Sequence, residues 1–290
     1  MIKIVTDYGF CYGVSHAIET FASLRKGQEH IYLTHPILHN EAENRRWMDL
    51  VGASFLRPDT ILKKEDVVVL SAHGHTLEEE SAYKGKARIL DLTCPLILSR
   101  NRMVPQREEG VSYLYLGKKD HQETIGFLSH FPYFQLIDSK KDVFMQLGEM
   151  KIEKKIVFVP QTTSSSCLYH QLLSYLEKKG EIIFSLPLCH CYESRALSSS
   201  SFVKSLDYRK DSFLVCGDPS SSNAREILSA VKSANPSLIS DIVLEAKDVS
   251  KDQLEKNIYI TSATSVSKET VEALVIGLEK RVRDLKERHP

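Results

Sequence analysis

Residues 67–74 read VVVLSAHG and pass directly from four apolar residues to a polar loop. A short apolar run of this kind is typical of a strand that is buried on both faces of a parallel sheet. The same change follows the apolar runs at 2–5, 113–116, 156–159, 212–215 and 258–260. Helical patterns lie among these runs, at 14–24, 41–51, 167–179, 224–233 and 268–287. The alternation predicts an α/β fold with parallel sheets.

The polar loops after these strands are rich in Ser, Thr, Asn and His. In open α/β sheets, ligands bind outside the carboxyl ends of the strands, so we expect the loops to line one polar crevice. A polar turn would explain any single loop, but six of them together favour a binding site. A serine run at 198–201 predicts instead a mobile loop or the start of a helix.

The composition is that of a globular protein: 290 residues, 42% hydrophobic and 26% charged, with a formal net charge of zero. A neutral chain has no general field for attracting nucleic acid or an anionic membrane. No apolar run approaches the ~20 residues of a membrane span, and the N-terminus lacks the features of a signal peptide. We therefore expect a cytoplasmic protein that binds neither nucleic acid nor a membrane. In that compartment its cysteines are expected to be thiols or metal ligands rather than disulfides.

Three cysteines, Cys11, Cys94 and Cys189, stand in loop-like contexts and are separated by 83 and 95 residues. Each separation is close to a third of the chain, which suggests three pseudo-equivalent α/β modules around a common centre. The predicted modules span 1–95, 96–190 and 191–290. Of the other cysteines, Cys216 ends an apolar run and is interpreted as a buried small hydrophobe, and Cys167 begins a helical pattern.

Three thiolates cannot complete the four-cysteine ligation that is usual for iron–sulfur clusters. On a four-iron cube they would leave one iron open, and an open iron can bind substrate and act as a Lewis acid. Cys191, two residues after Cys189, could replace it as a ligand or act as a redox-labile neighbour. Scattered structural cysteines without any metal are the alternative that spacing alone leaves in place.

The chain resembles a known family, the 4-hydroxy-3-methylbut-2-enyl diphosphate reductases, also called LytB or IspH. The order and spacing of the matching strings, taken together, are highly specific, and they run nearly from end to end. The strings are GFCYGVSHAI at 9–18, HPILHN at 35–40, SAHG at 71–74, DLTCPL at 91–96, HQETIG at 121–126, QTT at 161–163, Cys-x5-Arg at 189–195, SSN at 221–223 and TSATS at 261–265.

The resemblance implies three α/β modules around a central [4Fe–4S] cluster with one open iron. By motif position, Cys11, Cys94 and Cys189 would be the cluster ligands. The implied reaction is a two-electron reductive dehydroxylation in non-mevalonate isoprenoid biosynthesis, in which the allylic alcohol diphosphate loses its hydroxyl as water and yields isopentenyl and dimethylallyl diphosphates. A one-electron donor such as ferredoxin or flavodoxin would supply the electrons.

The resemblance also implies roles for side chains in the polar loops. Glu123 would protonate the departing hydroxyl, because expulsion of hydroxide is difficult without a proton donor. Thr162 would act with it in the proton-delivery network. A multiply charged diphosphate needs several hydrogen-bond donors in a closed cavity. The implied substrate-binding residues are His39, His73, His121, Thr162, Ser221, Ser222, Asn223 and Ser265.

Several positions depart from the family pattern. The departures lie at 6–9, His16, Asn101, 189–195 and 262–265. They leave all implied ligands and the acid in place, so we expect them to tune the site through surrounding residues. Two other functions stay open: a related [4Fe–4S] enzyme acting on a different small anionic substrate, and a noncatalytic cluster-binding redox sensor.

Overall fold

The computed structural model describes residues 1–24, 29–38 and 40–288. Clustering of contacts divides the chain into two compact units. The first unit comprises Met1–Ser15, Leu38–Arg45 and Cys191–Pro290, and the second comprises His16–Ile37 and Arg46–His190. Helices α1 (Tyr12–Ala22) and α2 (Glu41–Val51) begin in the first unit and continue into the second.

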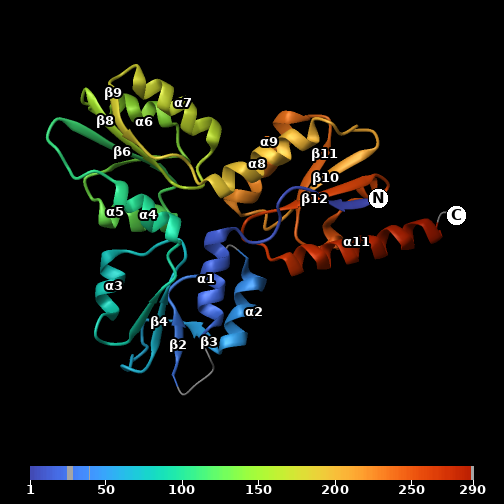
Figure 1. Cartoon of the computed structure of the whole chain (residues 1–290), viewed down its shortest axis with the longest axis horizontal. Helices are drawn as coiled ribbons and strands as arrows, with labels where there is room; N and C mark the ends of the chain where they lie inside the picture. Colours follow the sequence, from blue (N-terminus) through green and yellow to red (C-terminus); the bar gives the residue numbers. More distant parts are fainter. Residues whose placement is uncertain (25–28, 39, 289–290) are drawn as a thin grey trace. The chain divides into compact units, whose positions relative to one another are not determined.

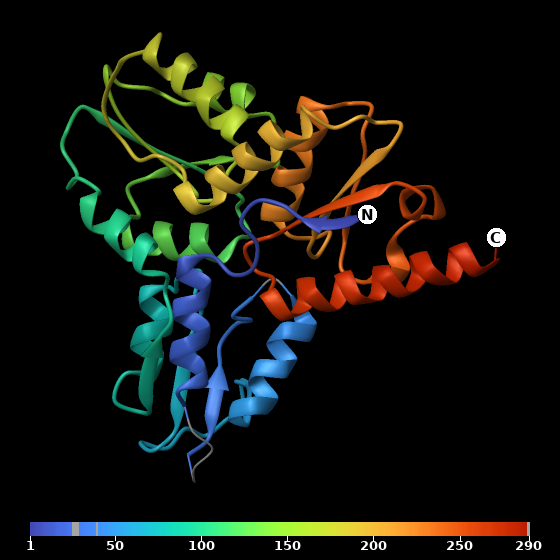
Figure 2. The ribbon, with the colours of Figure 1, turned by 45° about the vertical axis from the view of Figure 1, so that its right-hand side comes forward.

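The first unit is built on a parallel sheet whose four strands are, in spatial order, β1 (Ile2–Ile4), β12 (Asn257–Ser262), β10 (Asp211–Cys216) and β11 (Ile239–Val243). Ile2 lies opposite Ile258, so the N-terminal strand joins strands from the C-terminal part of the chain (Figures 1 and 2). Figure 1 shows α8 and α9 on one side of this sheet and α11 on the other. The helices are α8 (His190–Val203), α9 (Ser222–Ala234), the short 3-10 helix η1 (Ala246–Asp248), α10 (Lys251–Leu254) and α11 (Lys268–Arg288).

The core of the first unit surrounds β10, all six residues of which are buried. Because helices cover both faces of the sheet, this central strand is apolar along most of its length rather than alternating. Ile227 of α9 and Leu278 of α11 are fully buried in the same cluster. The helices therefore hold the carboxyl ends of β10 and β12 in fixed positions, and the polar loops at 217–221 and 263–267 start from those ends.

The second unit contains two more parallel sheets. The first has the spatial order β3 (Ala53–Phe55), β2 (Ile31–Leu33), β4 (Val67–Leu70) and β5 (Arg88–Asp91). The second has the order β7 (Gln135–Asp138), β6 (Val111–Gly117), β8 (Lys155–Pro160) and β9 (Glu181–Ser185). The helices here are α3 (Leu77–Tyr83), α4 (Pro95–Met103), α5 (Gln122–His130), α6 (Val143–Glu149) and α7 (Ser166–Glu177).

Contacts between α3 and α5 connect the two sheets of the second unit. The Leu77 backbone N–H donates to the Ser129 hydroxyl at 3.0 Å, and that hydroxyl donates to Glu78 at 2.9 Å. The Gln122 side chain donates to Glu79 at 3.3 Å. These bonds fix the start of α3, which follows β4, against α5, which follows β6. The carboxyl ends of two central strands are thereby brought into one neighbourhood.

The predicted fold class is confirmed, since the three sheets formed by the described residues are all parallel and helices alternate with the strands. The five predicted helices correspond to α1, α2, α7, α9 and α11. The interpretation of the serine run was wrong, because 198–201 lies inside α8, where Ser199 is fully buried. The module boundaries 1–95, 96–190 and 191–290 stay a prediction.

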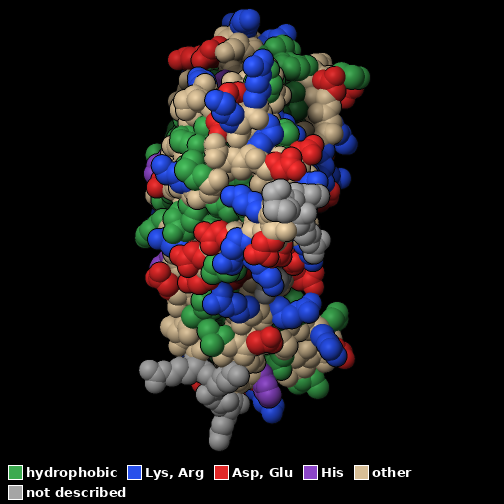
Figure 3. All heavy atoms as spheres, turned by 90° about the vertical axis from the view of Figure 1, so that its right-hand side faces the viewer, with side chains coloured by type: hydrophobic (Ala, Val, Ile, Leu, Met, Phe, Trp, Pro, Cys, Tyr) green, Lys and Arg blue, Asp and Glu red, His purple; other side chains and the backbone are tan. Residues whose placement is uncertain are grey.

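The surface and helices agree with the composition of the chain. On the face seen in Figure 3, basic and acidic side chains are interspersed, as expected for zero net charge. Within the described ranges, no helix combines the length and the apolar content that crossing a membrane would require.

Candidate active site

Glu123 is a buried acidic side chain of the second unit and lies on the first turn of α5. It is 7% exposed. The Thr162 backbone N–H donates to Glu123 Oε1 at 2.7 Å, and the Thr162 hydroxyl donates to Oε2 at 2.6 Å. Thr162 lies in the loop after β8, and α5 follows β6, so two neighbouring strands of one sheet position the pair. Both carboxyl oxygens are thus held by one residue.

The electrostatic surroundings favour the neutral form of this acid. Burial raises the pKa of Glu123, because a buried carboxylate loses its hydration. The two hydrogen bonds from Thr162 and the positive charge of Arg100 act in the opposite direction and are weaker. A carboxylic acid with a raised pKa keeps its proton to a higher pH than an ordinary carboxyl group and is suited to deliver it to a substrate.

Two of the predicted diphosphate-binding histidines lie together in the second unit. His121 precedes α5, and its Nδ1 accepts from the Glu123 backbone N–H at 3.2 Å. A neutral histidine that accepts at Nδ1 carries its proton on Nε2, from which it can donate to an anion. The His73 ring follows β4 and is 5.8 Å from the His121 ring between centroids. The third predicted histidine, His39, lies outside the described residues.

The loops of two predicted cluster ligands are bonded to these same segments. Cys94 lies immediately before α4, and its N–H donates to Ala72 O at 3.0 Å, next to His73. Cys189 lies immediately before α8, and its N–H donates to Thr162 O at 3.0 Å. The second unit therefore joins each of these cysteine loops directly to a loop that carries a predicted substrate residue.

The first unit brings the remaining predicted residues together around Thr264. The Cys11 N–H donates to Thr264 O at 3.2 Å, and the Thr264 N–H donates to Asn223 Oδ1 at 2.7 Å. Ser221 caps α9 by accepting from the Ala224 N–H, and Ser222 is the first residue of that helix. Ser265, the next residue after Thr264, is 7% exposed. The N-terminus of a helix of this length favours a bound anion.

A buried amide group in this region is suited to an anionic ligand. Asn223 is 6% exposed, and among the described residues its Nδ2 has no hydrogen-bond partner. A buried donor without a partner is costly, so such groups are often satisfied by a ligand or by ordered water. The orientation of Asn223, fixed through Oδ1, leaves this donor available.

The donor chemistry fits an iron–sulfur cluster. Cys11, Cys94 and Cys189 are partly exposed, and each directly precedes a helix, whose N-terminal dipole favours a bound anionic group. Cys11 belongs to the first unit and the other two to the second. In the part of the chain that the structure describes, no three His, Cys, Asp or Glu side chains form a metal-binding group, and no disulfide is present.

A buried arginine near Cys11 supports the same interpretation. Arg195 is 6% exposed and donates to Gly9 O at 2.8 Å and Ser262 O at 3.1 Å. Its Nε has no partner among the residues described. Burial lowers the pKa of Arg195, whereas the nearby Cys11 thiol and Asp7 favour its charged form. A buried guanidinium bonded to neutral carbonyls is stabilised by a nearby anion, which a thiolate-ligated cluster would provide.

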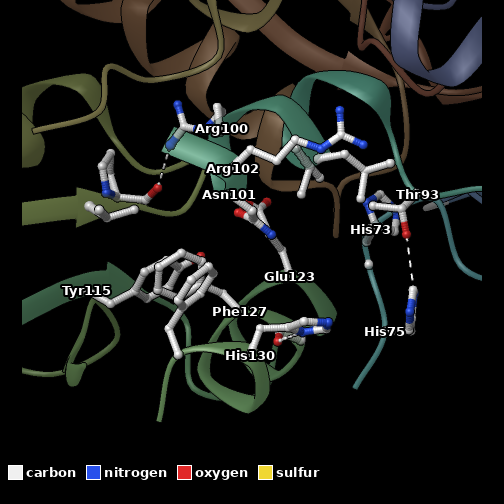
Figure 4. A pocket seen from close by; sticks show the side chains of 17 residues that line it. His73, His75, Thr93, Arg100, Asn101, Arg102, Tyr115, Glu123, Phe127 and His130 are labelled. Atoms are coloured by element: carbon white, nitrogen blue, oxygen red, sulfur yellow. Dashed lines mark hydrogen bonds between the residues drawn. The ribbon is translucent and has the colours of Figure 1, made fainter. Parts of the chain in front are cut away.

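A cavity of about 250 Å³ lies within the second unit beside Glu123. Figure 4 shows Glu123 of α5 close to Asn101 of α4. Tyr115 of β6 lines the same cavity. Sequence reasoning noted Asn101 only as a departure from the family pattern, and it missed Tyr115 and Arg100, which also line the cavity. A tyrosine inside an apolar run has the pattern of an ordinary core residue, so no signal distinguishes it.

The fold and these loops define an α/β protein whose polar residues gather at the carboxyl ends of parallel strands. The LytB protein family matches residues 2–279, so the chain belongs to this family.

Named relatives agree with this membership, and a solved structure shares the fold. The 4-hydroxy-3-methylbut-2-enyl diphosphate reductase of Clostridioides difficile (strain 630) is 27% identical over 286 residues, which cover 96% of this chain and 99% of the relative. That of Clostridium tetani (strain Massachusetts / E88) is 29% identical over 238 residues; the match covers 80% of this chain but only 36% of the relative. The structure of the E-1-hydroxy-2-methyl-but-2-enyl-4-diphosphate reductase from Plasmodium falciparum has a TM-score of 0.79 at 24% identity, covering 98% of this chain and 87% of that one.

Proposed function

We propose that this chain reduces 4-hydroxy-3-methylbut-2-enyl diphosphate to isopentenyl and dimethylallyl diphosphates. Family membership and the names of the relatives support this reaction. The observation that carries the proposal is the buried Glu123 carboxyl group held by Thr162, because the reaction needs a proton donor at the departing oxygen. The reaction consumes two electrons and two protons, breaks the C4–O bond and releases water.

The predicted cofactor is a [4Fe–4S] cluster held by Cys11, Cys94 and Cys189. When bound, such a cluster supplies electrons one at a time and a Lewis-acidic iron that no protein side chain ligates. The buried Arg195 guanidinium beside the Cys11 loop favours the negative charge of this group. A small one-electron donor such as ferredoxin or flavodoxin is the expected protein partner.

The polar loops would bind the diphosphate. His73 and His121 supply ring donors from the second unit, and Asn223 Nδ2 supplies an amide donor from the first. The N-terminus of α9 adds the partial positive charge of the helix dipole. Neutral donors and a helix terminus can hold an anion without an excess of Lys and Arg, in agreement with the zero net charge. The remaining proposed contacts come from His39, Thr162, Ser221, Ser222 and Ser265.

Glu123 would donate one proton to the hydroxyl oxygen as the C–O bond breaks, which turns a poor leaving group into water. The two electrons remain with the allylic fragment, and a second proton then adds to one of its terminal carbons. The carboxylate left on Glu123 accepts two hydrogen bonds from Thr162, so the charged form is stabilised after proton transfer.

The direct test is anaerobic turnover of the reconstituted protein with a chemical one-electron reductant, with iron and sulfide measured in the same sample. We expect both isoprenoid diphosphates to form. A protein with full iron and sulfide that does not consume this substrate would contradict the proposal and would favour another anionic substrate or a redox-sensing role.

A further inference from the structure

Two segments of the second unit run side by side beyond the regular pairing of β8 with β9. The Leu186 N–H donates to Phe158 O at 3.4 Å, and further along the Cys189 N–H donates to Thr162 O at 3.0 Å. Between these two bonds lie Pro160 and Pro187. Proline has no backbone N–H, so neither residue can donate a hydrogen bond to the other segment at this point.

The Arg100 side chain supplies donors where the prolines have none. Its Nη2 donates to Pro160 O at 2.9 Å, and its Nη1 donates to Pro187 O. Figure 4 shows Arg100 reaching from α4 with a dashed hydrogen bond to the neighbouring strand end. The guanidinium has its donors in a rigid planar fork, so it fixes the separation of the two carbonyls that it binds.

Both hydrogen bonds are directed at backbone, although the positive charge of Arg100 also acts on Glu123. In the ranges the structure describes, Arg100 forms no ion pair with a carboxylate, and both of its acceptors are peptide carbonyls. Arg100 lies on the helix that begins directly after Cys94. One side chain therefore joins that helix to the segment that leads to Thr162 and to the segment that leads to Cys189.

We propose that Arg100 is a positioning residue that aligns the Thr162 and Cys189 loops with the helix following Cys94. The alignment sets where the Thr162 hydroxyl meets Glu123 and where the Cys189 thiol is presented. The effect of this alignment on catalysis rests on the proposed function. The ordering of the two loops by the Arg100 guanidinium does not rest on it.

The test is amide hydrogen exchange on the metal-free protein, comparing Arg100→Met and Arg100→Lys with wild type. Methionine removes both donors at similar length, and lysine keeps the charge without the fork. In Arg100→Met we expect the Thr162 and Cys189 amides to exchange faster, on the order of tenfold, since two hydrogen bonds from a charged donor are lost. The central residues of β6 and β8 should exchange as in wild type. Arg100→Lys should show a smaller, equally local effect.

The matched control is Arg107→Met, which makes the same change of charge at an exposed position of the second unit. It should leave the Thr162 and Cys189 amides unchanged. Unchanged exchange of these amides in both Arg100 variants, or equal acceleration across β6 and β8, would overturn the proposal. If Arg100→Met does not fold, Arg100→Lys decides alone: local acceleration supports the proposal, and wild-type exchange overturns it.

The reconstituted enzyme provides a second readout. Arg100→Met should lower kcat about tenfold with little change in KM. Arg100→Lys keeps the positive charge near Glu123 but not the fork, so it should recover only part of the rate if alignment is what is lost. The exchange experiment needs neither cluster nor substrate. A wild-type protein without turnover would therefore contradict the proposed function and leave this inference to be decided by the exchange data.

Discussion

Thr162 binds both oxygens of Glu123, its backbone N–H at 2.7 Å from Oε1 and its hydroxyl at 2.6 Å from Oε2. A backbone N–H can only donate, whereas a hydroxyl can donate or accept. Oε1 must therefore be an acceptor in every protonation state. A proton on Oε2 can be accepted by the Thr162 hydroxyl, and the same hydroxyl can donate to Oε2 once that proton has left.

Removal of the Thr162 hydroxyl should impair the proton donor without removing the backbone contact. We expect Thr162→Val to lower turnover by about ten- to a hundredfold, since a hydrogen bond to a charged carboxylate is lost. Thr162→Ser keeps the hydroxyl and should stay within a fewfold of wild type. Steady-state rates at matched iron content measure the difference. Equal rates for the valine and serine variants would show that the hydroxyl has no part in the reaction.

The raised pKa of Glu123 predicts how stability depends on pH. Because the folded pKa lies above the ordinary value of 4.5, folding favours the protonated form, and that contribution is lost as pH rises through the folded pKa. Glu123→Gln cannot ionise and should lack this loss. Urea unfolding of both metal-free proteins from about pH 4 to about pH 8 should show wild type weakening relative to the variant. A pH-independent difference would argue against a raised pKa.

The three predicted ligands should each be needed for the cluster. Serine in place of Cys11, Cys94 or Cys189 should strongly reduce iron and sulfide after anaerobic reconstitution, because the thiolate ligand is lost. Cys167→Ser is the matched control, since Cys167 is exposed on α7, and it should retain wild-type metal content. Full iron and sulfide in Cys189→Ser would instead assign the ligand to Cys191.

The cysteines outside the predicted ligand set should differ in reactivity. Cys216 is fully buried, and burial raises its pKa to about 12, so little thiolate is available. Cys167 is exposed. Iodoacetamide at neutral pH should therefore label Cys167 in the folded metal-free protein and Cys216 only after denaturation, as read by mass spectrometry. Rapid labelling of Cys216 without unfolding would contradict its place in the core.

Sequence reasoning predicts those parts of the fold that have a strong local pattern. β4 and β10 are buried along their whole length, so each appears in the sequence as a short apolar run that is typical of a buried strand. β3 has three residues, of which two are exposed, and no apolar pattern marks it. The pairing of β1 with β12 joins residues more than 250 positions apart, and nothing local encodes it. The serine run was misread because helix packing in the core overrode its intrinsic preference.

The candidate site, like the fold, is predicted from the sequence only in part. The family resemblance implies that Glu123 and Thr162 act together. The structure places them in contact because each follows one of two adjacent parallel strands, which end at the same edge of the sheet. The role proposed for Arg100 has no sequence signal, because its partners are peptide carbonyls of Pro160 and Pro187. Any residue type provides a carbonyl, so only the path of the backbone in space shows that one guanidinium can bind both.

The central claim is that Glu123, held by Thr162, is the proton donor of a reductive dehydroxylation. The most direct measurement compares product formation by wild type and Glu123→Gln at matched iron and sulfide content. The amide keeps the shape of the side chain but cannot supply the proton, so the account predicts a full cluster and turnover at least about a hundredfold slower than wild type. Turnover of Glu123→Gln at the wild-type rate would contradict the account.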